Sequence, residues 1–115
     1  MINMTDSERF EQFIQAISAA EQIWLLQADD GLFAMVEDKL GNAYMPVWSS
    51  KEACTEASKE EWSDYAVEFM PINEFLNWCK ELAEDEIKLG VEPDINGRLL
   101  PVEPTVFADI LRQLK

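Results

Sequence analysis

The sequence predicts an α+β fold in which helices pack on an antiparallel or mixed sheet. Three observations predict it. Apolar residues recur at helical spacing in several segments, short apolar or alternating segments lie between turn residues, and the hairpins come before the longer connections. The expected order is α-β-β-β-α-β-α-β-(β)-α, within one domain that spans residues 1–115.

The first helix is expected to begin at Thr5-Asp6-Ser7-Glu8, which has the form of a capping box. Phe10, Phe13, Ile14 and Ile17 follow at the spacing that places side chains on one helical face. We interpret this stripe as part of the core.

A three-stranded antiparallel meander is expected next. Its strands are residues 23–27, 32–36 and 43–48, and they are joined by turns at Asp29-Asp30-Gly31 and at residues 38–42. Pro46 has no backbone N–H, so the third strand should lie at an edge or carry a bulge there. The end of this strand is therefore expected to be exposed to partners.

The second half of the chain continues with alternating elements. A short helix should follow Ser49-Ser50-Lys51-Glu52, with Ala53, Cys54 and Ala57 on its buried face. Further elements are a period-two strand at 65–70, a helix after Pro71, a half-buried strand at 87–92, a turn at 94–97, a short strand at 99–100 and a final helix near Pro104, which buries Phe107, Ile110, Leu111 and Leu114.

The chain is strongly acidic. It has 23 acidic and 9 basic residues, for a formal net charge of −14, and the halves before and after Ser58 carry equal net charge. Nucleic acids and anionic lipids should be repelled by such a surface. The charge either keeps the protein soluble or attracts a basic partner.

Common catalytic designs are missing from the sequence. There is no histidine, and the four glycines stand singly, without a phosphate-binding motif. The acidic groups Asp29-Asp30 and Glu84-Asp85-Glu86 are interpreted as turn residues, and Cys54 and Cys79 as buried thiols. No catalytic residue, metal ligand or cofactor site is predicted.

Four tryptophans are the most informative side chains. Trp24 and Trp78 fall in apolar patterns and are interpreted as core residues. Trp48 and Trp62 either pack in the interior or form an exposed aromatic patch among carboxylates, and aromatic anchors carry much of the binding energy of interfaces. Together with Tyr65, they are the predicted binding residues.

Several motifs, taken in order, resemble the bacterial "domain of unknown function 2750" family. These are Met45-Pro46-Val47-Trp48, Glu52-Ala53, Trp62 with Tyr65, and residues 72–76 with Trp78 and Leu82. The resemblance implies a small stand-alone cytoplasmic α+β protein and supplies no catalytic or binding residues. Glu84-Asp85-Glu86 departs from the family pattern, which is less acidic there and includes a glycine.

A cytoplasmic location is also expected from the chain itself. Its apolar runs, such as residues 23–26, are far shorter than the roughly 20 residues of a membrane-spanning helix. No secretory signal is visible at the N-terminus.

The leading hypothesis is a non-enzymatic, acidic interaction module that binds a basic protein through the face around Trp48 and Trp62. An enzyme is the first alternative, with carboxylates in a pocket near Tyr44, Tyr65 or Arg98. A small-ligand-binding domain is the second, favoured by the aromatic content and the edge strand. The oligomeric state stays open.

Overall fold

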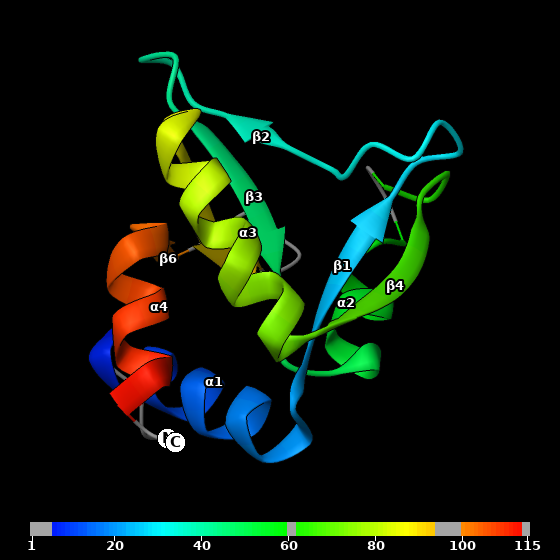
Figure 1. The fold of residues 1–115 in the computed structure, drawn as a ribbon. Helices are drawn as coiled ribbons and strands as arrows, with labels where there is room; N and C mark the ends of the chain where they lie inside the picture. The colour runs from blue at the N-terminus through cyan, green and yellow to red at the C-terminus, as the bar shows by residue number, and fades with distance from the viewer. Residues whose placement is uncertain (1–5, 60–61, 94–99, 114–115) are drawn as a thin grey trace.

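The computed structural model describes residues 6–59, 62–93 and 100–113. The helices in these ranges are α1 (Asp6–Ala20), α2 (Lys51–Ala57), α3 (Ile72–Glu84) and α4 (Pro104–Gln113). The strands are β1 (Gln22–Gln27), β2 (Val36–Glu37), β3 (Ala43–Val47), β4 (Ala66–Pro71), β5 (Ile87–Val91) and β6 (Leu100–Val102) (Figure 1). This order and the α+β class confirm the prediction from the sequence.

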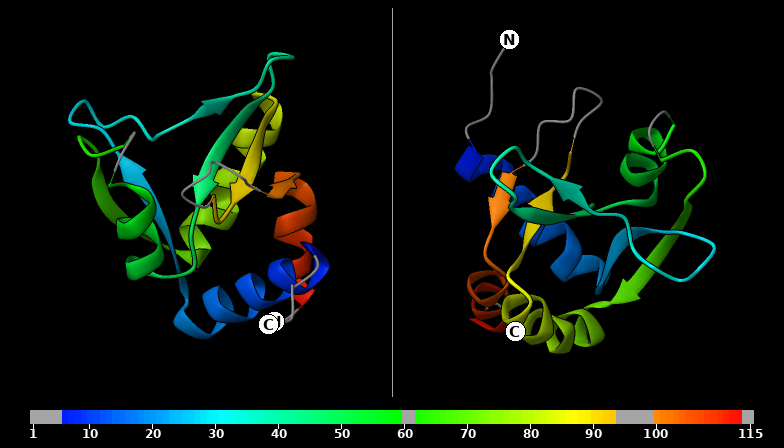
Figure 2. Two further views of the ribbon diagram at one scale, coloured as in Figure 1. Left: turned by 180° about the vertical axis from the view of Figure 1, so that it is seen from behind. Right: turned by 90° about the horizontal axis from the view of Figure 1, so that it is seen from above.

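The strands form two sheets. One has four strands in the order β2-β3-β5-β6, with β3 and β5 parallel and the outer pairs antiparallel. The other is the antiparallel pair β1-β4, at the right of Figure 1, and α3 and α2 lie on its opposite sides (Figures 1 and 2). The larger sheet is therefore mixed and the smaller one antiparallel, and both arrangements fall within the expectation of antiparallel or mixed pairing.

The expected three-stranded meander is split between the two sheets. The hairpin after β1 forms only near its turn, where Ala28 N–H donates to the Leu32 carbonyl and Ala34 N–H donates to the Leu26 carbonyl. The chain then enters the two-residue strand β2, which belongs to the other sheet and pairs there with β3. Leu32 is 68% and Met35 42% exposed, so the return segment has no continuous buried face to hold it on β1.

Pro46 lies in the part of β3 that is beyond the end of β2 and pairs only with β5. β2 pairs only with Ala43 and Tyr44, whereas β5 accompanies β3 to Val47. The edge at Pro46 was thus predicted correctly, but the expected exposure of the strand end was wrong. β1 covers that end, because Trp24 and Trp48 exchange backbone hydrogen bonds of 2.9 and 3.0 Å.

The main core lies between α1, α3, α4 and strands β1, β3 and β5. Its helical stripes confirm the predicted ones, and the rings of Phe75 and Phe107 meet edge to face at 5.5 Å. Such an arrangement is the favoured geometry for aromatic pairs. The buried helical residues are Phe13, Ile14, Ile17, Ile72, Phe75, Leu76, Cys79, Leu82, Phe107, Ala108 and Leu111.

A second cluster lies on the other face of β1, under α2. Its buried members are Leu26, Ala34, Trp48 and Cys54. α2 is capped by Ser50, whose hydroxyl accepts a hydrogen bond from Ala53 N–H at 3.1 Å. The cap is thus one residue later than the Ser49-to-Glu52 box suggested. The small residues of α2 allow its close approach to β1.

Both cysteines are free and buried, as predicted. Burial raises the pKa of each thiol to about 12. No helix in the part of the chain that the structure describes is long and apolar enough to cross a membrane. Thr5 of the first capping box, the turn at 94–97, Leu99 and Leu114 lie outside the described residues.

Candidate interaction surface on β4

Trp48, the first predicted binding residue, is a core residue. It is 1% exposed, and its indole N–H donates to the carbonyl of Pro93 at 3.3 Å. Its ring meets the ring of Trp62 edge to face, with centroids 6.0 Å apart. An exposed binding role for Trp48 is therefore wrong; the residue supports Trp62 from beneath.

Trp62 and Tyr65, the other two predicted residues, are half-buried and pack against this same second cluster. Tyr65 N–H donates to the Trp62 carbonyl at 3.0 Å, which forms a turn immediately before β4. The structure therefore brings all three predicted aromatic residues together at the start of this strand.

Phe69 is the residue that was not singled out from the sequence. It is 54% exposed, and its ring lies 5.6 Å from that of Trp24, its partner across the β1-β4 pair. The period-two pattern of residues 65–70 already placed Phe69 on the same face as Tyr65 and Val67. That pattern was the signal that could have identified it.

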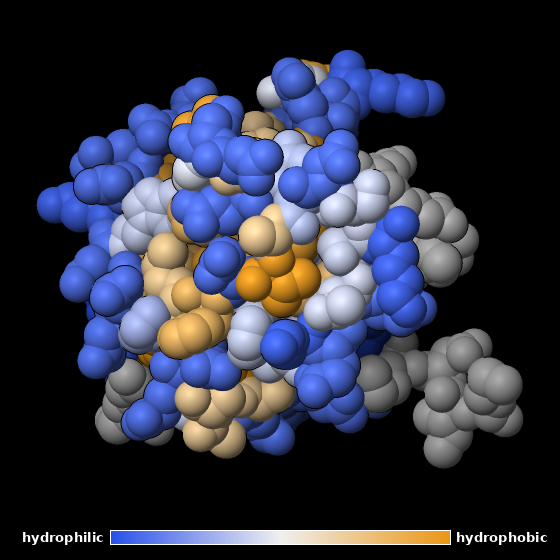
Figure 3. All heavy atoms as spheres, turned by 90° about the vertical axis from the view of Figure 1, so that its right-hand side faces the viewer, coloured by the Kyte–Doolittle hydropathy of each residue, from blue (hydrophilic) through white to orange (hydrophobic). Residues whose placement is uncertain are grey.

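These aromatic and apolar residues form one surface, which we call the β4 surface and define as Trp62, Tyr65, Val67 and Phe69. Figure 3 views the side of the molecule that carries β4 and shows a hydrophobic patch surrounded by hydrophilic residues. Exposed apolar patches that are rimmed by polar residues can mark interaction sites.

β4 has a free edge. β1 is its only neighbour in the described sheets. Ile72 N–H donates to the Glu21 carbonyl, and this pair continues the β1-β4 register by one step. Hydrogen-bonded pairs alternate in an antiparallel ladder, so the backbone groups of Val67 and Phe69 point away from β1.

The backbone hydrogen bonds on the other side of β1 lead to the same conclusion about Val67 and Phe69. Opposite Phe69, the backbone groups of Trp24 bond to Trp48; opposite Val67, the Leu26 carbonyl bonds to Ala34. Both β1 residues thus direct these groups away from β4. The N–H and C=O groups of Val67 and Phe69 are consequently presented at the free edge.

The segments next to the β4 surface in the chain are rich in carboxylates. Asp64 and Glu68 are exposed directly before and within β4, and Glu52 and Glu56 are exposed on α2. Lys59 pairs with Glu56 at 2.8 Å. The sequence adds Glu60 and Glu61 between α2 and β4, so segment 51–71 is predominantly acidic.

A groove between α3 and α4 is a second candidate site. Its volume is about 430 Å³, and its walls carry charges of both signs. The lining residues are Leu76, Cys79, Lys80, Ala83, Glu84, Thr105, Ala108, Asp109 and Arg112.

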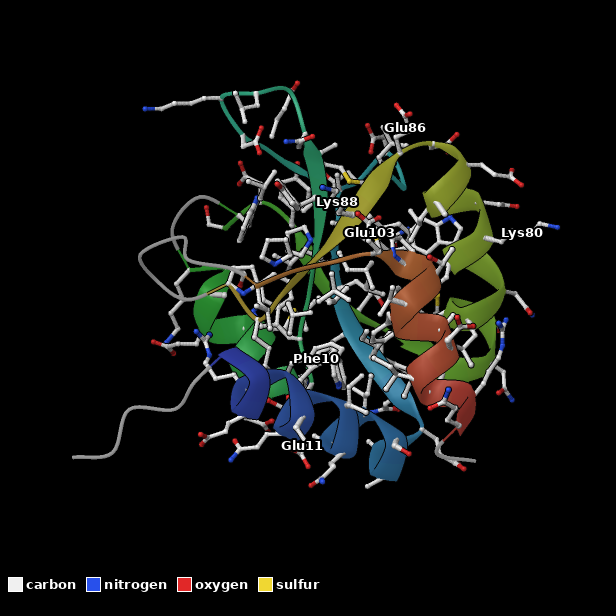
Figure 4. All side chains as sticks on the ribbon, turned by 90° about the vertical axis from the view of Figure 1, so that its left-hand side faces the viewer. Phe10, Glu11, Lys80, Glu86, Lys88 and Glu103 are labelled. Atoms are coloured by element: carbon white, nitrogen blue, oxygen red, sulfur yellow. The ribbon has the colours of Figure 1, made fainter. Side chains whose placement is uncertain are left out.

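Two further pockets, each of about 390 Å³, are lined by pairs of carboxylates. One is lined by Glu56 and Glu92, and Glu92 accepts hydrogen bonds from the backbone N–H and the hydroxyl of Ser49. The other is lined by Glu86 and Glu103, and Glu103 pairs with Lys88 at 3.7 Å (Figure 4). One carboxylate of each pair is thus already engaged by a neighbour.

The two tyrosines named for the enzyme alternative do not line any of these three pockets. Tyr44 donates to Asp38 in a turn, Tyr65 belongs to the β4 surface, and Arg98 lies outside the described residues. Within those residues, no group of three or more Asp, Glu or Cys side chains is arranged to hold a metal ion.

A known protein family matches nearly the whole chain. Residues 10–111 match the family model described as "Protein of unknown function (DUF2750)". The chain belongs to the DUF2750 family. This confirms the resemblance seen in the sequence and extends it over nearly the whole chain.

Other comparisons place the DUF2750 chain less closely. A solved structure, "Anabaena Tic22 (protein transport)", is 14% identical with a TM-score of 0.46, over 99% of this chain and 54% of that chain. The DUF2750 chain thus spans about half the length of that structure. No curated protein sequence matches it significantly.

Proposed function

We propose that this DUF2750 domain is an interaction module that binds a basic segment of another protein at the β4 surface. The observation that carries the proposal is Phe69, which is 54% exposed on a strand with a free edge. We further propose that the partner is a bacterial cytoplasmic protein, since the free cysteines suit a reducing compartment.

Apolar contact and charge would have separate roles in this complex. Phe69 and Trp62 offer aromatic area that a partner can desolvate, and aromatic residues dominate the energetics of interfaces. The carboxylates of the neighbouring segments would attract cationic partners and speed their encounter. The net charge of −14 extends this attraction beyond direct contacts.

The proposal can be tested by selecting binders from a displayed library of short Lys- and Arg-rich peptides and measuring their affinity by calorimetry. Phe69→Ala should weaken binding about tenfold or more, which corresponds to about 1.4 kcal/mol. Val106→Ala is the matched control, because Val106 is 49% exposed on α4, away from the β4 surface.

Charge can be tested in the same assay. Glu68→Lys should weaken binding more than Glu11→Lys, although both replace an exposed carboxylate and change the net charge equally. Affinity should fall as salt rises, because exposed charges are screened. The proposal would be contradicted if Phe69→Ala and Val106→Ala changed the affinity equally, or if the library yielded no binders.

The groove between α3 and α4 favours the small-ligand alternative. Its volume of about 430 Å³ lies within the usual range for ligand sites. A thermal-shift screen of metabolites, followed by chemical-shift mapping of hits, tests it. Hits that shift the resonances of Ala83 and Ala108 would support this function, and a uniformly negative screen would count against it.

A further inference from the structure

We infer that the partner segment adds to β4 as an antiparallel strand with alternating apolar and basic residues. Apolar side chains would lie opposite Val67 and Phe69, and a basic side chain opposite Glu68. The inference rests on the proposed function, and it specifies the binding mode and the sequence pattern of the partner.

The backbone supports strand addition. The outward N–H and C=O groups of Val67 and Phe69 are two residues apart, which is the spacing of hydrogen-bonded pairs in an antiparallel ladder. An extended segment laid along this edge would exchange two hydrogen bonds with each residue. Strand addition of this kind gives affinity through the main chain and specificity through alternate side chains.

The side chains of β4 dictate the pattern. Val67 and Phe69 lie on the face of the second cluster, and Glu68 points to the opposite face. A strand paired with β4 would place its own alternate residues on these same two faces. Favourable cross-strand neighbours are therefore apolar on the Phe69 side and cationic on the Glu68 side.

A basic partner fits the edge better than a second copy of the chain. An unprotected edge strand invites pairing, and β4 has only Glu68 as a charged residue among its six. Pairing two copies would juxtapose two acidic edges, each on a domain with a net charge of −14. Like charges repel across such a ladder, whereas Lys or Arg opposite Glu68 is attracted.

The test uses blocked peptides of the sequence Lys-Val-Lys-Val-Lys-Val, as long as β4 itself. One version carries N-methyl groups on the valines and another on the lysines, so their side chains and charge are unchanged. Valine methylation removes the N–H groups that would donate to Val67 and Phe69. It should lower affinity about tenfold or more, whereas lysine methylation should change it less than about threefold.

A second readout comes from amide hydrogen exchange of the protein. The unmethylated peptide should protect the N–H groups of Val67 and Phe69 at least tenfold, roughly in proportion to its occupancy. Glu68 and Met70, whose N–H groups face β1, are internal controls and should change little. A peptide with glutamate in place of lysine should bind Glu68→Lys better than the original protein.

Each outcome separates the inference from the proposed function. If both methylated peptides bind as well as the parent and Phe69→Ala still weakens binding, the β4 surface binds without strand addition and the inference is overturned. If neither this peptide nor any basic library member binds, the proposed function itself fails. Selective loss with valine methylation supports both.

Discussion

The hydroxyl of Tyr44 donates a hydrogen bond to Oδ2 of Asp38 at 3.0 Å and closes the turn between β2 and β3. Asp38 also accepts hydrogen bonds from the backbone N–H groups of Leu40 and Asn42 and from the Asn42 amide. These bonds, first of all the one from the Asn42 side chain, lower the pKa of Asp38 to about 2. A single carboxylate thus organises the whole turn.

Asp38 should make the turn sensitive to acid. Because its pKa is lower in the folded state than the ordinary 3.8, its stabilising effect is present above about pH 4 and is lost as the pH falls through 2. Asp38→Asn should remove this part of the pH dependence of unfolding. Tyr44→Phe should raise the pKa of Asp38 in a carbon-detected NMR titration, whereas Tyr65→Phe should leave it unchanged.

The two thiols should be inert in the native protein. At pH 8 a disulfide reagent should modify Cys54 and Cys79 only as fast as the protein opens, and both at once in urea. Their pKa of about 12 lies above the ordinary 9.0, so their contribution to stability is present below pH 9 and declines as the pH rises toward 12. Fast modification of either thiol without denaturant would contradict this prediction.

Trp48 and Trp62 should differ in their effect on stability. Trp48→Phe leaves the carbonyl of Pro93 without its indole donor and opens space in the second cluster, at a cost of about 1–3 kcal/mol. Trp62→Phe, at a half-buried position, should cost less than about 1 kcal/mol. Urea unfolding measures the loss of stability in both variants. Equal losses would contradict the prediction that the indole of Trp48 stabilises the second cluster more than that of Trp62.

Glu92 should prefer glycine over alanine as a replacement. Its φ of +46° lies in the left-handed region, which is costly for residues with a Cβ. Glu92→Ala and Glu92→Gly lose the same bonds to Ser49, yet the glycine variant should be more stable by about 1 kcal/mol. Lys88, within β5, is the control position, where alanine should be the more stable replacement.

The fold class was predictable because most elements have a local signal. The stripes of α1, α3 and α4 and the alternation of β5 are visible within short windows of sequence. The pairing of strands is not local. β1 pairs with β4, which lies far along the chain, and this pairing places Val67 beside Leu26, a buried member of the second cluster. No window around β1 contains that information.

The candidate site was predictable in position but not in its exposed members. Trp62 and Tyr65 were named from their acidic, aromatic context and lie at the start of β4, whereas Trp48, which the sequence left open between the interior and the surface, is buried. Phe69 stays exposed because it lies outside the cluster that α2 covers. The position of α2 relative to β4 depends on tertiary packing, so the local sequence does not reveal it.

β1 contributes alternate residues to two different interiors, with Ile23 and Leu25 in the main core and Trp24 and Leu26 against the second cluster. A single-residue deletion or insertion within this strand would exchange the two sets. Both interiors would be mispacked at once, so no compensation is possible within either one. Length variation among related chains should therefore be absent from residues 22–27 and concentrate in the adjoining turn at 28–32.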